Sequence, residues 1–332
     1  MKGYVTDAAG VCWQLPTCER WEMEFCVGTP CDSFLLRCPW SMGQGDDPGK
    51  WVRFHAQWGG ERVFTGVVDE CEVSLTARGC FLEISGRGRA ALLLDNEALG
   101  QDYQLATPAD ILRDHVTPYG IESVGAEKLV GVPRFRVDTG SSEWTVLEQF
   151  LREQGHSAPK FDRKGRLILS GWEDDRILTV GDGTPVTALV YRNNRHGVLS
   201  EVLVRDRYSG KIQRVANEKF ATLGGRARRV LTVSGRASAY EMETAGQEQL
   251  DRSAREWEEV EITFPVLFAA CPGQLVEISR SGFSHNGRYR VARMTTGMDD
   301  GGSWSRLLLR RAEYVGGERD VVLGTGAPKS CG

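Results

Sequence analysis

The sequence lacks the features that mark membrane, secreted and nucleic-acid-binding proteins. Its longest apolar runs, residues 90–94 and 265–271, fall far short of the roughly 20 residues that a membrane helix needs. Residues 1–11 contain one lysine and no apolar run, so no secretory signal peptide is expected. The net charge is -4 and the isoelectric point is about 5.9, which gives no overall attraction for nucleic acid or an anionic membrane. We expect a soluble protein without a membrane anchor, whose partners are other proteins.

Catalytic motifs are also missing. The sequence has no GxSxG and no HExxH motif, and its histidines are scattered singly. Its acidic pairs lie beside glycine, proline or turn residues, where solvated loop acids are expected, and adjacent carboxylates do not converge across a bond as a glycosidase requires. We therefore predict that the chain is not an enzyme and assign no catalytic residue. The histidines are His55, His115, His156, His196 and His285, and the acidic pairs are Asp46 and Asp47, Asp174 and Asp175, and Asp299 and Asp300.

Cysteine is plentiful near the start, but its spacing fits neither zinc nor a disulfide framework. Five of the nine cysteines fall within the first forty residues, yet there is no CxxC pair, the total is odd, and His55 is the single histidine nearby. We predict reduced thiols that act as small buried apolar groups, and no metal site. The five are Cys12, Cys18, Cys26, Cys31 and Cys38.

One glycine motif imitates a nucleotide-binding turn. Gly86, Gly88 and Ala91 match GxGxxA between a predicted strand and a predicted helix. A second parallel strand ending in an acid should follow, but residues 96–107 are polar and lead into another helix. We favour a strand-to-helix corner that glycine permits, and we predict no cofactor.

Two arginine-rich segments, Arg192–Arg195 and Arg226–Arg229, could contact phosphates. The aromatic residues alternate inside strand patterns as core or interface residues do. A solvated or subunit-facing charged surface is favoured, and a DNA-facing patch stays as the alternative.

The hydrophobic pattern predicts β-rich ends around a helical middle. Apolar residues alternate with polar ones at Trp21, Met23 and Phe25, and again in most of the chain after residue 174. Helices are predicted from the cap at Thr107 and from Ser142 to Gly155, with a polar helix at 245–257. We predict an α+β, mainly β chain with four parts: a first antiparallel β-barrel domain at 1–99, a small α/β insert at 100–173, a second β-barrel domain at 174–315, and a flexible Gly-rich tail at 316–332.

Several segments resemble one protein family. The stretch from Phe64 to Leu75 (FTGVVDECEVSL) is followed by residues 82–97 (LEISGRGRAALLLDNE), and both are similar to the first tube-like domain of the baseplate hub family of contractile phage tails and tail-like particles. Residues 142–169 are similar to its middle element, a WxxLxxFL helix before a DxxGRL hairpin. PGxxV at 272–276 and GxYxV at 287–291 resemble its last barrel. The resemblance covers about residues 1–315, and the early cysteines and tryptophans depart from the pattern.

The resemblance implies a structural baseplate hub subunit. In that family each of three chains gives two similar β-barrels, so a homotrimer forms a pseudo-sixfold ring that adapts the symmetry of a hexameric tail tube to a trimeric spike. Wedge and tape-measure proteins would lie nearby, and DNA could pass through the channel without sequence-specific binding. The implied location is the baseplate of a virion or of a tail-like particle such as a tailocin, assembled in the cytoplasm of the host bacterium.

Two other functions remain open at this point. A cell-wall hydrolase associated with the tail would need a catalytic set that the sequence does not contain. A glycan-binding adhesin at the tail tip could use exposed tryptophans to stack on sugars. Its candidates are Trp40, Trp51 and Trp58.

Overall fold

The computed structural model describes residues 1–312, apart from 28–30, 42–46, 156–157, 170–175 and 234–236. The predicted flexible tail at 316–332 therefore lies outside the described residues, as do His156, Asp46 and the pair Asp174 and Asp175.

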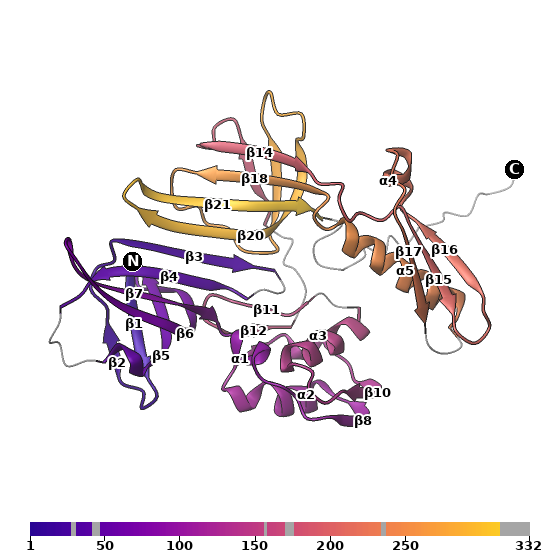
Figure 1. The fold of residues 1–332 in the computed structure, drawn as a ribbon, viewed down its shortest axis with the longest axis horizontal. Coiled ribbons are helices and arrows are strands. Elements are labelled where there is room, and N and C mark those ends of the chain that lie inside the picture. The colour runs from indigo at the N-terminus through magenta and orange to yellow at the C-terminus, as the bar shows by residue number, and fades with distance from the viewer. Residues whose placement is uncertain (28–30, 42–46, 156–157, 170–175, 234–236, 313–332) are drawn as a thin grey trace, which may run out of the picture.

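One continuous sheet runs through both β-rich ends of the chain (Figure 1). Eight of its strands lie side by side, each hydrogen-bonded to the next in antiparallel fashion. In spatial order they are β14 (Ala188–Asn193), β18 (Glu258–Phe264), β21 (Gly302–Arg311), β20 (Gly287–Asp299), β3 (Arg20–Cys26), β4 (Ser33–Pro39), β7 (Gly79–Gly88) and β6 (Glu61–Thr76). We call these eight strands the central sheet.

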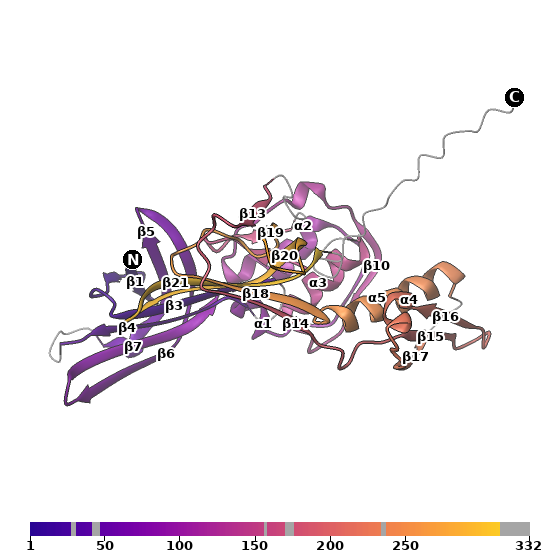
Figure 2. The same cartoon turned by 90° about the horizontal axis from the view of Figure 1, so that it is seen from above.

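The remaining strands of the two β-rich ends form second layers. Past β6 the sheet continues through three strands of the first end, β5 (Trp51–Trp58), β1 (Lys2–Asp7) and β2 (Cys12–Gln14). At the last end β19 (Leu275–Ser279) pairs with β20, and β13 (Leu178–Gly181) pairs in parallel with β19. In Figure 2, β5, β13 and β19 lie on the same side of the central sheet as helices of the insert. One face of the sheet is thus covered by these layers.

The sheet is continuous because β3 pairs with β20. Their register sets Phe25 opposite Met294 and Glu22 opposite Gly297. We call this pairing the seam. On its covered face two separate hydrophobic cores meet, one containing Trp21, Met23 and Phe25, and the other built from Val180 and from residues 260–309. The alternation seen in the sequence is therefore the alternation between a buried and an open face.

The insert packs two capped helices against short strands. Thr107 and Asp110 form a capping box at the start of one helix, and Ser142 caps the other, as the sequence predicted. The elements are α1 (Ala91–Leu94), α2 (Pro108–His115), α3 (Glu143–Glu153), β8 (Gln101–Ala106), β9 (Ser123–Val124), β10 (Val132–Val137), β11 (Lys160–Phe161) and β12 (Leu167–Ile168). Single 3₁₀ turns occur as η1 (Pro48–Lys50), η2 (Thr117–Tyr119) and η3 (Ala126–Lys128).

A further α/β unit interrupts the last β-rich part. It contains β15 (Glu201–Asp206), β16 (Ile212–Ala216), α4 (Glu218–Thr222), β17 (Arg228–Val233) and α5 (Ala239–Ala254). Its mixed three-stranded sheet has the order β16-β15-β17 and stands apart from the central sheet (Figure 1). Helix α5 begins at Ala239, earlier than the predicted start at residue 245, because Ser238 and Glu241 form a capping box. The interval 174–315 therefore holds more than a β-domain.

The predicted α+β, mainly β fold is confirmed, with strands in both ends and an α/β insert between them. Among the described residues, the strand path runs from β14 to β2 without a pairing between those two end strands. Closure of each end into a barrel stays a prediction.

The seam allows no side chain at Gly297. A Cβ there would lie 2.8 Å from the main-chain oxygen of Trp21 and 2.9 Å from the ring of Trp304. We predict that Gly297→Val lowers the free energy of unfolding by about 1–3 kcal/mol, because β20 must move away from β3. Ser303→Val on the exposed end of the neighbouring strand is the control, with an expected change within about 0.5 kcal/mol. Equal losses in urea unfolding of the two variants would contradict the close approach.

Candidate assembly surfaces

The central sheet leaves one broad face open. Cross-strand register brings every second residue of the eight strands to this face, opposite the two cores. Figure 2 shows the insert and the second layers on the other side. Arginine and glutamate dominate the open face: Arg192, Glu259, Glu261, Arg306, Arg310, Arg293, Arg20, Glu22, Glu24, Arg37, Glu83, Arg87, Glu70 and Glu72.

These charges pair across strands, either with the neighbouring strand or, for Arg20 on β3, over β4 to β7. Arg310 approaches Glu259 to 2.9 Å, and Arg20 approaches Glu83 to 2.8 Å. Arg192 reaches Glu261 at 3.5 Å. Each such surface pair contributes little to stability, but together they cancel the local charge. The open face is polar and nearly neutral, so it exerts no strong pull on a polyanion.

The central sheet ends in two free edges. At one end, β14 pairs only with β18 among the described strands. At the other, the stretch of β6 from Glu70 to Thr76 pairs only with β7, because β5 leaves β6 at Val67. Leu75 at that edge is 72% exposed. Unpaired edges are hazards in a monomer and become pairing surfaces in an assembly.

Acidic groups gather beside the seam. The carboxylate of Asp32 accepts a hydrogen bond of 2.9 Å from the main-chain N–H of Cys26. Glu24 accepts one of 3.3 Å from the hydroxyl of Thr295 across the seam, with the Arg293 guanidinium at 3.7 Å. Loss of solvation raises the pKa of Asp32 to about 7. The negative charge of Glu24 adds to this shift, and the hydrogen bond from Cys26 offsets only part of it. The seam therefore holds a carboxyl group that titrates near neutral pH.

One turn of the insert touches both β-rich ends. The guanidinium of Arg163 donates a 2.9 Å hydrogen bond to the carbonyl of Ala270, while its own carbonyl accepts one of 3.2 Å from the hydroxyl of Thr65. Its side chain also lies over the ring of Phe25 at 5.5 Å. The turn between β11 and β12 thus ties the insert to both sides of the seam.

The insert contains a buried chain of acid, imidazole and phenol. His115 Nδ1 lies 2.6 Å from Glu143, and its Nε2 lies 3.1 Å from the hydroxyl of Tyr103. Tyr119 donates to the other oxygen of Glu143 at 2.9 Å. Such a chain could relay a proton, but it lies inside the hydrophobic core of the insert, and its members do not line the hollow beside Glu201 or the one beside Asn217. We interpret it as a structural link between α2 and α3 that sequence reasoning missed, because the residues are 28 positions apart.

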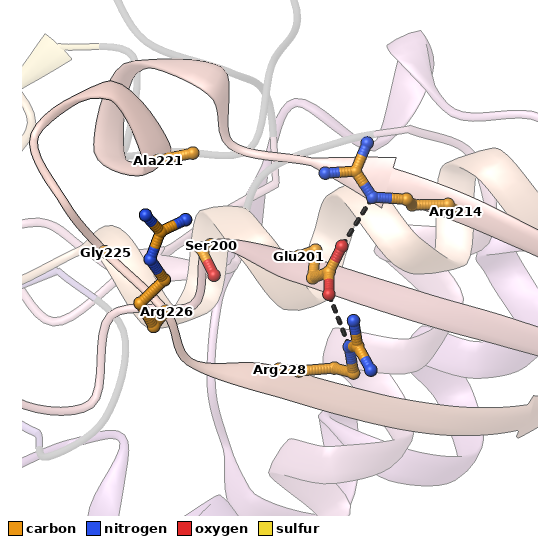
Figure 3. A pocket seen from close by; sticks show the side chains of 7 residues that line it. All are labelled: Ser200, Glu201, Arg214, Ala221, Gly225, Arg226 and Arg228. Atoms are coloured by element: carbon orange, nitrogen blue, oxygen red, sulfur yellow. Dashed lines mark hydrogen bonds and ion pairs between the residues drawn. The ribbon is translucent and has the colours of Figure 1, made fainter.

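The larger hollow, about 330 Å³, lies in the unit that contains β15, β16 and β17 (Figure 3). Glu201 stands at its centre, with the Arg214 guanidinium on one side at 2.5 Å and the Arg228 guanidinium bonded to it on the other. Arg226 lies on the other side of the hollow, which Ala221 of α4 also lines. Two of the arginines noted in the sequence thus line one hollow.

The other arginine-rich segment is used within the chain. Arg192 belongs to the open face, and Arg195 donates to the carbonyl of Leu223 at 2.6 Å and lies over the ring of Phe220. Arg229 points the other way from Arg228 and bonds Gln249 of α5. Neighbouring arginines of the segment 226–229 therefore point to opposite faces of the small sheet.

The GxGxxA motif lies mostly within a strand. Gly86 and Gly88 belong to β7, and only Ala91 begins a helix of four residues. A Cβ at Gly86 would lie 2.0 Å from the carbonyl oxygen of Val67, so the position requires glycine for strand packing. The geometry supports the interpretation as a corner.

The candidate sugar-stacking tryptophans do not form one platform. Trp51 is buried, 5% exposed, and packs against Trp40 with ring centres 5.8 Å apart. Trp58 is 50% exposed at the other end of β5.

His196 and His285 lie in exposed or half-buried turns. Asp299 accepts a hydrogen bond of 3.0 Å from the indole N–H of Trp304.

The early cysteines are dispersed. Cys18 and Cys38 lie in the core of the first β-rich end, whereas Cys31 joins the core of the insert. Burial raises the pKa of Cys18 to about 11 and that of Cys38 to about 12, so both thiols stay protonated at neutral pH. Within the described ranges, no three or more His, Cys, Asp and Glu side chains cluster as metal ligands would.

The part of the chain that the structure describes includes no helix with the length and apolarity to cross a bilayer.

Comparison with known proteins points to phage tails. The chain is 27% identical over 168 residues to the baseplate hub protein gp44 of Escherichia phage Mu, a match that covers 49% of this chain and 41% of that protein. The resemblance to the baseplate hub family is confirmed. The match spans less than half of the curated relative, and no family model matches the sequence.

Solved structures agree on the fold. The tail protein of Neisseria meningitidis MC58 superposes with a TM-score of 0.77 at 16% identity, covering 93% of this chain and 96% of that one. The 43 kDa tail protein of prophage MuSo2 from Shewanella oneidensis gives a TM-score of 0.76 at 18% identity, with coverages of 95% and 98%. Over more than nine-tenths of the chain, the fold is therefore similar to that of these two tail proteins.

The titration of Asp32 gives a test of the seam. The pKa of Asp32 in the folded chain lies above the usual value near 3.8, so the native state holds this proton more tightly than the unfolded chain does. The contribution of this proton to the free energy of unfolding is therefore full at low pH and is lost as pH rises from about 4 to about 7. We predict that Asp32→Asn becomes more stable than the parent across this window, by up to about 4 kcal/mol. Urea unfolding between pH 4 and pH 8 measures the difference. Asp300→Asn in an exposed turn should track the parent, and a constant difference for Asp32→Asn would contradict the raised pKa.

Proposed function

We propose that the chain is a structural baseplate hub subunit of a phage tail or tail-like contractile particle. The observation that carries the proposal is the central sheet, which merges both β-rich ends of the chain into one surface with a polar open face and two free edges. The similarity to phage tail and baseplate hub proteins supports a role as a structural component of the tail.

Association of copies follows from the edges. The free edge of β14 lies at one end of the central sheet and the free part of β6 at the other, so a contact between them on two copies is heterologous. A heterologous contact closes into a ring when the rotation between copies allows it. Three copies, each giving two β-rich domains, would form a homotrimer with pseudo-sixfold character. Domains at 1–99, 100–173 and 174–315 are the division that we propose, with the unit around β15 as an excursion from the third.

The open face then becomes the wall of a channel. Its cross-strand ion pairs leave a nearly neutral polar surface, over which DNA or a protein could pass without being held. Such a ring can adapt the symmetry of a hexameric tail tube to a trimeric spike, with wedge and tape-measure proteins beside it. Its place is the baseplate of the particle, after assembly in the host cytoplasm.

A catalytic role has less support. The buried acid–imidazole chain of Glu143 and His115 is enclosed in the core of the insert, and the tryptophans proposed for sugar stacking are divided between core and surface. The hydrolase and adhesin alternatives therefore rank below the hub.

The test is the mass of the purified protein in solution. We expect a trimer by light scattering and a ring with a central hole in particle images. The double change Leu75→Asp with Val190→Asp places a carboxylate at each free edge and should reduce the trimer to monomer at micromolar concentration, because both edges lose apolar contact and gain repulsion.

The matched control is Leu99→Asp, which changes an exposed leucine in a loop away from both edges. It should leave the mass unchanged. A parent protein that stays monomeric at high concentration, both alone and with its tail tube protein, would overturn the ring proposal.

A further inference from the structure

The small sheet of β16, β15 and β17 is covered on one side only. Helix α5 packs against Val202, Val204 and Val215, whose side chains share one face. The register brings the alternate residues to the opposite face. That face, which we call the outer face, presents Ala216, Glu201 and Arg228 in one row, Arg214, Leu203 and Val230 in the next, and Ile212, Arg205 and Thr232 in the third.

Apolar side chains stand exposed in the middle of the outer face. Val230 is 64% exposed and Ile212 is 63% exposed, and Leu203 between their strands is half-buried. Val230 and Ile212 lie on the two outer strands, with Leu203 on the strand between them, and they face away from the core that α5 fills. A contiguous apolar strip of this kind on a folded domain is typical of an interaction surface.

Arginines surround the strip. Arg214 and Arg228 share Glu201 between them, while Arg226 borders the same hollow from the segment that precedes β17 (Figure 3). The two guanidinium groups hold the pKa of Glu201 below its usual value, so its carboxylate is charged and offsets only one of its neighbours. Arg205 adds another positive charge in the third row. The outer face is therefore positive although the whole chain carries -4.

We propose that the outer face is a docking surface for an acidic, partly apolar segment of another protein. Carboxylates of that segment would bind Arg205, Arg226 and the free N–H groups of Arg214 and Arg228, and its apolar side chains would cover Val230 and Ile212. A protein fits better than nucleic acid because a phosphate backbone gains nothing from the apolar strip and is repelled by Glu201 at its centre. The proposal stands apart from ring formation, since it uses neither the central sheet nor its edges.

The experiment measures binding of a fluorescein-labelled peptide in which glutamate alternates with leucine and valine. Fluorescence anisotropy with the full chain should show binding that weakens with added salt, and lysine in place of every glutamate should abolish it. The double variant Arg226→Glu with Val230→Asp should lose at least about tenfold in affinity. The first change reverses a positive charge that would bind the peptide, and the second places a carboxylate within the apolar strip, where it repels the glutamates of the peptide.

The matched control changes an exposed arginine and an exposed valine of the insert, Arg152→Glu with Val130→Asp, and should bind as the parent does. Light scattering on both variants should give the mass of the parent, which separates this result from the fate of the ring. Equal affinity of the two double variants would overturn the proposal. Stronger binding of a single-stranded thymidine oligonucleotide than of the acidic peptide, lost in Arg226→Glu with Val230→Asp, would also overturn it in favour of a nucleic-acid surface.

Discussion

Main-chain hydrogen bonding between β3 and β20 is the constraint on which the rest of the architecture depends. It joins strands whose contacting residues, such as Glu24 and Thr295, are 271 positions apart. The entropy lost in closing so long a loop grows only logarithmically with its length, whereas each added strand pair satisfies main-chain groups that would otherwise need water. Without the seam the two β-rich ends would each present an extra free edge, and the open face would be divided in two.

The seam also sets how charge is distributed. Once β3 and β20 are in register, arginine and glutamate side chains on eight strands fall on one face and find opposite charges on nearby strands. Pairs of this kind contribute only a few tenths of a kcal/mol each, so they do not hold the sheet together. Their effect is on the electrostatic potential above the open face of the sheet, which they reduce toward zero. A neutral polar wall is the surface expected where molecules must slide and not adhere.

Sequence reasoning found the strands and helices because their signals are local. Alternation at Trp21, Met23 and Phe25 and the caps at Thr107 and Ser142 depend on neighbours within a few residues. The seam is not local, since a period of two says which face a side chain takes but not which strand lies beside it. For the same reason the pattern could not separate the unit around β15 from the β-rich part in which it is embedded. The buried link of His115 and Glu143 was missed because isolated polar residues on two helices carry no spacing signal.

The two sheets of the molecule treat arginine differently, and the contrast bears on what each surface is for. On the central sheet Arg310 and Arg192 each approach a glutamate of the adjoining strand, and Arg20 reaches across β4 to a glutamate of β7. On the small sheet one glutamate serves two arginines, others surround it, and exposed valine and isoleucine fill the space between. Uncompensated arginine beside apolar surface favours a desolvated contact with carboxylates, whereas compensated arginine favours contact with water. The central sheet is therefore suited to enclose a passage, and the small sheet, displaced to one end of the molecule in Figure 1, is suited to hold a neighbour.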